Sequence, residues 1–465
     1  MSPPWQSSYG PTPGVLAYNL SFLGRIDSGS REEYDGLPVR VSVWRGRLRR
    51  AGWGMADQGF SSLTNFALGV LVARSVSPQA FGAFALVFTI YTLLLGFCRA
   101  LATEPLLVRF TAAPDRWPSG VSSAAGMAAL IGVFAGSGCL IVGSIFGGFI
   151  GYGLIGLGLT LPGLLVQDSW RYAFFAEGRA DKAFVNDVVW AIVLAVAFPL
   201  LAILDQLSLL SLMLAWGIAA SVGAVFGVFQ SHVIPNPGRT RLWWRQQRDL
   251  TRRYIGEFAA INGAGRLADF GVGAVAGLSS LGSVRGATIL LGPLNVLLMG
   301  ARMVSLPEAV RILNSSPHKL RRLSALVSFV LAIGSITWGA IIALLPSRFG
   351  VALLGSTWPG ARRLIVPIAL GSAAQGILMG AGVGLRALLA VKRALRARVI
   401  LSLLILPATI GGAAVGQAYG AAWGGAAAAM VGAILWWGHL NRAIEEYGAS
   451  QAGLTPAVAM EVQPD

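Results

Sequence analysis

The sequence predicts an all-α polytopic membrane protein with about 12 transmembrane helices. Only 12% of its 465 residues are charged, whereas a soluble domain carries roughly 25%. The mean hydropathy is +0.66. The apolar residues form runs of about 20 residues, which is long enough to cross ~30 Å of hydrocarbon. These runs are continuously apolar, so they lack the alternation of a membrane β-barrel.

Twelve such runs follow the first 50 residues, and each predicts one membrane-spanning helix. They extend over 56–76, 80–101, 121–145, 149–166, 183–204, 208–230, 254–276, 284–305, 324–345, 364–384, 399–417 and 421–441.

The order of these runs predicts two lobes of six helices each. Residues 1–52 have no apolar core of a signal peptide and predict a disordered basic cytoplasmic tail. The first lobe covers 53–232 and the second 253–443, and a basic interfacial linker, 233–252, joins them. Residues 444–465 predict a second cytoplasmic tail.

A shift of 204 residues aligns the first two runs with the seventh and eighth without gaps. Phe66 then meets Phe270, and Glu104 meets Glu308. Because six passes is an even number, the two copies enter from the same side of the membrane. This arrangement predicts a parallel pseudo-two-fold axis with a central cavity between the lobes.

The positions of lysine and arginine predict the orientation. With a cytoplasmic N-terminus, thirty basic residues lie on the cytoplasmic side. Five lie outside, namely Arg74, Arg285, Arg348, Arg362 and Arg363, and Arg266 lies at membrane depth. Basic residues accumulate on the cytoplasmic side of membrane proteins, so both termini are predicted there. The same rule explains the net charge of +16 without a nucleic-acid partner.

Two local patterns predict packing and surface features. In the linker, Trp243 and Trp244 are expected at the lipid headgroups of an interfacial helix. Small residues recur every four positions at Gly412, Gly416, Gly420 and Gly424, which predicts close helix packing. The two cysteines, Cys98 and Cys139, lie within apolar runs and provide no disulfide framework.

Ionisable side chains at membrane depth are the candidate site residues, since they are costly there and usually face a wet interior. The first run carries Asn65 and Arg74, and the seventh carries Glu257, Arg266 and Asp269. Arg266 and Asp269 are three apart on one helix face, as either a structural ion pair or a cavity pair.

Other charged residues lie at the predicted ends of helices. Asp57 is expected to reach the inner headgroups. Arg99 and Glu104, about a turn and a half apart, are either a gate or a helix-end pair. Asn186 and Asp187 begin the fifth run, where capping is favoured over a proton site.

Cofactor chemistry has no counterpart in the sequence. The three histidines, His232, His318 and His439, lie at the ends of runs and predict no metal site. The phosphate-binding pattern G-x-x-x-x-G-K-[ST] does not occur, so ATP hydrolysis and a bound cofactor are not expected.

With these residues in hand, a family resemblance becomes visible. The stretches DQGFSSLTNFALGVLVARSVSPQAFGAFAL, FCRALATEPLLVRF, DSWRYAFFAEGRADKAFVNDVVWA, GSTW and GLRALLAVKRALRAR carry it. Over about 51–443 the chain resembles the oligosaccharidyl-lipid flippases of the multidrug/oligosaccharidyl-lipid/polysaccharide exporter superfamily. It looks most like an actinobacterial O-antigen type polysaccharide-unit flippase. Ala73-Arg74 and the pair Arg99 and Glu104 match motifs of the related peptidoglycan-precursor flippases.

The resemblance implies a flippase of the plasma membrane that is not an enzyme. It implies that undecaprenyl-diphosphate-linked oligosaccharides are exported by alternating access, with a polysaccharide polymerase and glycosyltransferases as further partners. Since guanidinium groups bind phosphate oxygens in a bidentate manner, arginines are expected to hold the diphosphate. The expected cavity residues are Arg74, Arg99, Arg266, Asn65 and Glu104, and the expected counter-ion or coupling residues are Asp269, Asp187 and Glu257.

Three alternatives differ in their requirements. A drug or cation antiporter of the same superfamily would use Asp269 and Asp187 to bind a cation. A major-facilitator transporter would carry Gly-x3-Asp-Arg-x-Gly-Arg after the second run, and APDRWPSG lacks it. A membrane glycosyl- or acyltransferase would need acids or histidines in a substrate-facing loop, and the outer loops hold little beyond Asp205.

Overall fold

The computed structural model describes residues 37–313 and 317–458, which are almost entirely helical and contain no strand. The first half comprises α2 (Leu37–Ser75), α3 (Pro78–Cys98), the π-helical turn η1 (Arg99–Thr103), α4 (Glu104–Phe110), the short helix η2 (Pro114–Arg116), α5 (Trp117–Phe146), α6 (Gly148–Glu177), α7 (Ala180–Ile203) and α8 (Leu209–Ser231). The second half comprises η3 (Pro237–Arg239), α9 (Thr240–Ala276), α10 (Leu278–Leu290), α11 (Pro293–Leu313), α12 (Pro317–Ala343), α13 (Ser347–Leu354), η4 (Gly355–Thr357), α14 (Trp358–Ala387) and α15 (Val391–Val458).

Eight helical segments of the described chain are long and apolar enough to cross a membrane. They begin with Pro78–Phe110 and end with Val391–Ala449, and the last contains two of the predicted spans. The predicted spans 56–76, 254–276 and 284–305 coincide with α2, with α9, and with α10 and α11. α2 and α9 carry more polar residues and do not meet the same criterion. The third span is divided between α10, which has only 13 residues, and α11.

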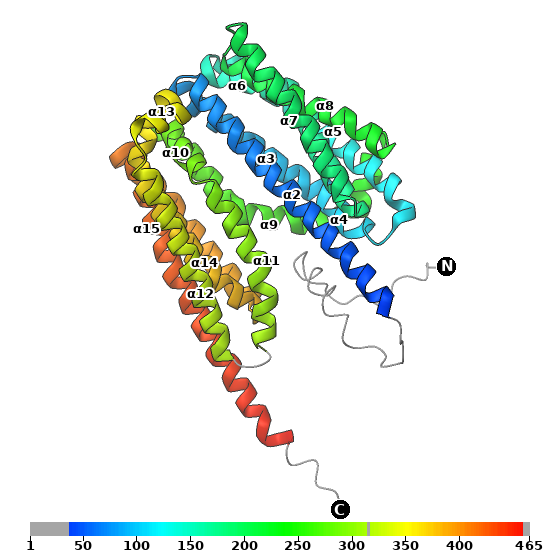
Figure 1. Ribbon diagram of the computed structural model, residues 1–465, viewed down its shortest axis with the longest axis vertical. Helices are drawn as coiled ribbons and strands as arrows, with labels where there is room; N and C mark the ends of the chain where they lie inside the picture. Colours follow the sequence, from blue (N-terminus) through cyan, green and yellow to red (C-terminus); the bar gives the residue numbers. More distant parts are fainter. Residues whose placement is uncertain (1–36, 314–316, 459–465) are drawn as a thin grey trace, which may run out of the picture. The chain divides into compact units, whose positions relative to one another are not determined.

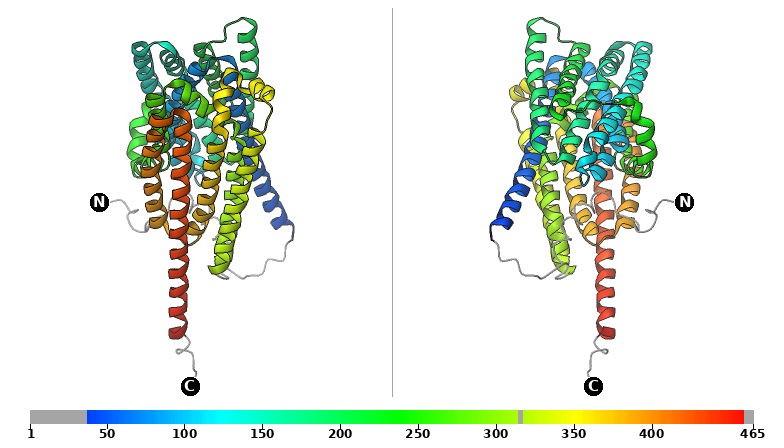
Figure 2. Two further views of the ribbon diagram at one scale, coloured as in Figure 1. Left: turned by 90° about the vertical axis from the view of Figure 1, so that its left-hand side faces the viewer. Right: turned by 90° about the vertical axis from the view of Figure 1, so that its right-hand side faces the viewer.

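The helices of each half pack mainly against one another. In the first half α6 lies between α5 and α8, and α7 covers α8 (Figure 1). In the second half α12, α14 and α15 run side by side (Figure 2). In the core of the first half, two buried indoles donate hydrogen bonds to backbone carbonyls of neighbouring helices. Trp117 Nε1 donates to Ala173 O, and Trp170 Nε1 donates to Ala224 O, both at 2.9 Å.

Small residues allow the closest helix contacts. Two non-helical residues, Gly416 and Gln417, interrupt α15. The chain reverses at these two residues, and the two arms of the hairpin then pack closely. A Cβ on Gly412 would lie 2.2 Å from Gly420 O, and one on Gly420 would lie 2.1 Å from Gly412 O. The close packing predicted from the glycine repeat is therefore confirmed. The two buried cysteines are free, as expected.

The two halves meet along α3 and α10. A Cβ on Gly82 would lie 1.8 Å from Leu278 O, and one on Gly282 would lie 2.5 Å from Pro78 O. This reciprocal contact relates the two helices by a shift of 200 residues, and α3 and α10 also begin 200 residues apart. The gap-free sequence shift of 204 is therefore wrong at these helices, because a chain rich in Gly, Ala and Leu also matches itself by chance.

Two predicted segments differ from the structure. The tail predicted as disordered over 1–52 is helical from Leu37 onward, and residues 1–36 lie outside the described part. The linker boundary at 252 lies inside α9, so the linker and the next predicted span form one continuous helix.

The sequence predicts Trp243 at the lipid headgroups, but the structure places it inside the protein. Its side chain is buried, its Nε1 donates to Leu101 O at 2.9 Å, and its ring stacks on Phe110. Trp244 is 38% exposed and stays available to an interface. Trp243 and Trp244 differ in burial because neighbouring residues lie about 100° apart around the helix axis, so they face different sides.

Gly82→Ala tests the contact between the halves. The added methyl group would overlap the backbone oxygen of Leu278, and such overpacking lowers stability by about 1–3 kcal/mol. We expect a lower thermal unfolding temperature in detergent. Gly138→Ala is the matched control, because nothing lies within 4 Å of its Cβ position. Equal unfolding temperatures for both variants would contradict the contact.

Candidate functional site

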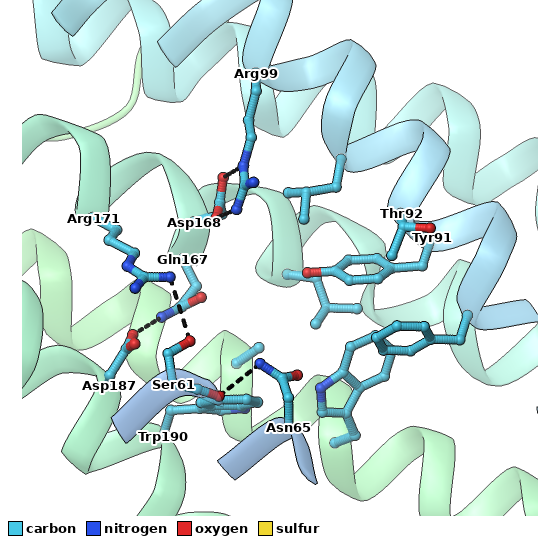
Figure 3. Close-up of a pocket in the computed structure, with 15 residues that line it drawn as sticks. Ser61, Asn65, Tyr91, Thr92, Arg99, Gln167, Asp168, Arg171, Asp187 and Trp190 are labelled. Carbon is cyan, nitrogen blue, oxygen red and sulfur yellow. Dashed lines mark hydrogen bonds and ion pairs between the residues drawn. The ribbon is translucent and has the colours of Figure 1, made fainter. Parts of the chain in front are cut away.

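A polar cavity of about 200 Å³ lies within the first half (Figure 3). Helices α2, α3, α6, α7 and α8, together with the first residue of η1, contribute its walls. Its aromatic lining consists of Phe88, Tyr91, Trp190 and Trp216. Its polar lining consists of Ser61, Asn65, Thr92, Arg99, Gln167, Asp168, Arg171 and Asp187.

Arg99 enters the cavity from the point where α3 becomes a π-helical turn. Such turns recur at functional sites. Its Nε donates to Asp168 Oδ2 at 2.9 Å, and its Nη2 donates to Asp168 Oδ1 at 2.6 Å. This is a bidentate pair, and the guanidinium also lies 5.3 Å from the centre of the Tyr172 ring. Nη1 of Arg99 makes no hydrogen bond within the described residues.

A second buried pair joins α6 to α2. Arg171 Nε and Nη2 both donate to Asp57 Oδ2, at 2.8 and 2.6 Å. Nη1 of Arg171 donates to Ser61 at 3.3 Å. Asp57 is fully buried. The prediction that it reaches the inner headgroups is therefore wrong. Burial of the carboxylate is tolerated because Arg171 neutralises it.

An amide network connects α6, α7 and α8 behind the cavity. Gln167 Nε2 donates to Asp187 Oδ1 at 3.0 Å and to Asn186 Oδ1 at 3.3 Å. Asn186 Nδ2 donates to Gly223 O and to Gln230 Oε1. Because α7 begins at Ala180, Asn186 and Asp187 lie within the helix. The capping role predicted for them is therefore wrong.

The charges of this network do not cancel. Three carboxylates, Asp57, Asp168 and Asp187, face two guanidinium groups, Arg99 and Arg171. With every group ionised, the first half carries one excess negative charge at the cavity. The two arginines of the cavity are both paired with aspartates, so the cavity is not lined by unpaired guanidinium groups.

Aromatic rings form the opposite wall. Tyr91 meets Trp216 edge-on with ring centres 4.7 Å apart, and Phe88 lies 5.8 Å from Tyr91 and 5.9 Å from Trp216. Edge and offset arrangements of this kind stabilise aromatic clusters. The cavity thus has one aromatic wall and one hydrogen-bonding wall.

A second polar cluster lies where α9 and α10 meet α3. Thr89 Oγ1 donates to Asp269 Oδ2 at 3.3 Å, and Arg266 Nη1 lies 3.7 Å from the same oxygen. Arg285 lies 4.7 Å from the centre of the Phe88 ring. Its Nε is buried without a hydrogen-bond partner in the described part. Phe88 therefore separates the cavity from this cluster.

The predicted site residues divide into three groups. Asn65, Arg99 and Asp187 line the cavity, and Asn65 Nδ2 donates to Ser61 O within α2. Arg266 and Asp269 form the ion pair that their spacing predicts, beside α3. The remaining three, Arg74, Glu104 and Glu257, are not among the residues that line the cavity.

Arg74 is exposed at the end of α2, where its backbone lies beside Gly355. Glu104 does not pair with Arg99, because Asp168 occupies that guanidinium. Neither the gate pair nor the helix-end pair predicted for Arg99 and Glu104 forms.

Sequence reasoning missed Asp168, Arg171, Gln167 and Arg285. The first three follow the apolar run 149–166, so they read as a loop, although α6 continues to Glu177. In Gln-Asp-Ser-Trp-Arg, the spacing of one, three and four residues is compatible with one helix face, and this spacing is the signal that indicates a polar site. Arg285 was assigned to the outer side, but it lies inside α10. No group of three or more metal-ligating side chains occurs among the described residues.

Comparison with known proteins identifies the fold. No family model and no curated protein matches the sequence. An inward-facing multidrug resistance MATE family transporter of the MOP superfamily is similar, with a TM-score of 0.63, 13% identity, 83% of this chain covered and 94% of that chain. The lipid II flippase MurJ in an inward closed conformation has a TM-score of 0.65, 11% identity, and coverages of 88% and 93%.

A third similar structure is a MOP superfamily transporter from Pyrococcus furiosus, with a TM-score of 0.55, 13% identity, and coverages of 86% and 95%. At these identities the likeness is one of fold. The chain therefore has the two-lobe, 12-helix fold of MOP-superfamily transporters, and the predicted fold class is confirmed.

Arg171→Met tests the buried pair in the site. It would leave Asp57 as an uncompensated buried charge, which lowers stability by about 3–5 kcal/mol. We expect a large fall in the unfolding temperature, with recovery on adding Asp57→Leu. Arg179→Met is the control, since Arg179 is 53% exposed in its pair with Asp181 and such pairs contribute about 0–1 kcal/mol. An equal fall for both would refute the buried pair.

Proposed function

We propose that this chain is a flippase that moves undecaprenyl-diphosphate-linked oligosaccharide units across the cytoplasmic membrane for cell-surface polysaccharide assembly. The observation that supports it best is the two-sided cavity of the first half beside the arginines of α9 and α10. The likeness in fold to transporters and a lipid flippase supports a transport role. The proposal places both termini in the cytoplasm, with a polymerase and glycosyltransferases as partners.

The cavity suits a saccharide. A pyranose ring has apolar C–H faces and a rim of hydroxyl groups. Tyr91 and Trp216 offer flat aromatic surfaces, and aromatic side chains bind such faces with little loss of conformational freedom. Asn65, Gln167 and Asp187 supply amide and carboxylate groups on the other wall, and these can both donate to and accept from hydroxyls.

The diphosphate needs cationic donors, because removing each charge from water costs several kcal/mol or more. Asp168 fixes the orientation of the Arg99 side chain through Nε and Nη2, and this leaves Nη1 to donate to a ligand. Arg285 has a buried Nε without a partner and lies on the far side of Phe88. Arg266 is held only loosely, at 3.7 Å from Asp269. These three arginines are the proposed phosphate contacts.

Alternating access follows from where the halves touch. The closest backbone approach between α3 and α10 lies at their beginnings, around Gly82 and Gly282. The halves also touch where Gly355 lies beside Arg74 and where α9 packs on the first half. Rocking about the contact between α3 and α10 would open and close the cavity while the prenyl tail stays in lipid. Asp187, Asp269 and Glu257 are proposed as counter-ion or cation-coupling groups, since Asp187 and Asp269 adjoin the arginines.

A cation or drug antiporter is the second candidate. The excess carboxylate of the first half supports it, since three aspartates against two arginines favour a cationic ligand. A strain depleted of the protein separates the two functions. The flippase predicts that lipid-linked saccharide accumulates on the inner leaflet with unchanged dye efflux. Loss of dye efflux without accumulation would support the antiporter and overturn the flippase.

Arg285→Gln tests the phosphate contacts. Removing one charge-assisted contact worth about 1.5–3 kcal/mol should reduce export of the lipid-linked saccharide about tenfold or more at equal protein level. Arg348→Gln is the control, because Arg348 also lies over a phenylalanine ring, 4.9 Å from Phe349, but is exposed. Normal export by Arg285→Gln would exclude this arginine from the diphosphate site.

A further inference from the structure

The first part of α9 presents a row of arginines that no part of the described chain neutralises. Arg241, Arg245, Arg248 and Arg252 are all exposed and make no hydrogen bond or ion pair within the described residues. Their spacing of four, three and four residues places them on one helix face over about 16 Å. We call these four residues the arginine row.

The opposite face of the same segment is fixed to the first half. Trp243, Gln247, Thr251 and Tyr254 are buried. Arg109 of α4 clamps the helix by donating to Gln246 O, to Gln247 Oε1 at 2.9 Å and to Asp249 Oδ2 at 2.6 Å. The clamp fixes the rotation of the helix, so the arginine row points away from the protein.

This arrangement favours an anionic partner. Like charges three and four residues apart destabilise a helix in the absence of counter-charges. The surroundings indicate a membrane surface, because the candidate span Leu209–Ser231 ends shortly before α9 begins. Leu242 is 55% exposed and Trp244 is 38% exposed. They flank the arginine row, and apolar and aromatic residues beside a basic face are typical of helices at the lipid headgroups.

We propose that the arginine row binds anionic phospholipid headgroups of the cytoplasmic leaflet. Clusters of four to eight basic residues on an amphipathic helix are typical of such binding, and each contributes roughly a fivefold factor in affinity. The site is separate from the transport cavity, so it stands whether the transported substrate is a lipid-linked saccharide or a drug.

The experiment measures thermal unfolding of the full-length chain in detergent during titration with phosphatidylglycerol or with zwitterionic phosphatidylcholine. We expect only phosphatidylglycerol to raise the unfolding temperature. The effect should weaken in 1 M salt, where the screening length falls to about 3 Å. Replacing the arginine row by glutamine should raise the half-saturating lipid concentration at least about tenfold, whereas replacement by lysine should preserve binding.

The matched control replaces four other exposed basic residues without described partners by glutamine, namely Lys319, Arg321, Arg322 and Lys392. This variant loses the same charge and should respond to phosphatidylglycerol like the parent. Unchanged unfolding temperatures in phosphatidylcholine check that the variants fold. The proposal fails if both glutamine variants lose the response equally, or if both lipids act alike. It also fails if an oligonucleotide of matched charge stabilises the parent as strongly as phosphatidylglycerol.

Discussion

The pairing of buried arginine with buried aspartate is the constraint on which the first half depends. Neither Asp57 nor Asp168 could stay ionised in a lipid-embedded core alone, since isolated buried charges are strongly unfavourable. Arg171 ties α6 to α2, and Arg99 ties the end of α3 to α6. The helices that wall the cavity are therefore fixed by the same groups that make it polar, and a ligand has to bind without separating them.

Packing in the rest of the chain follows from the absence of a hydrophobic driving force between helices in lipid. Small residues let backbones approach at Gly82 and Gly282 between the halves, and at Gly412 and Gly420 in the hairpin of α15. The close backbone contact between α3 and α10 lies at the beginnings of both helices, and the polar cluster around Asp269 lies further along them. A change in the angle between α3 and α10 would thus act directly on the polar cluster around Asp269.

The helix α9 combines roles that the sequence separates. Its beginning docks on the first half through Trp243 and Arg109, and its later part carries Arg266 and Asp269 at the junction with α3. A linker that is one rigid helix transmits displacement more directly than a flexible loop would. The contact with the first half and the polar cluster around Asp269 are consequently connected by a single helix.

The sequence by itself determined the elements, because span length and helical period are local properties. Apolar runs gave the helices, spacing gave the Arg266 and Asp269 pair, and glycine periodicity gave the hairpin packing. Only the tertiary structure decided the partners. Arg171 lies 114 positions from Asp57, and Arg99 lies 69 positions from Asp168. No local pattern encodes such pairs, since they depend on how whole helices rotate and pack, and the same packing turned Trp243 inward and Arg285 toward Phe88.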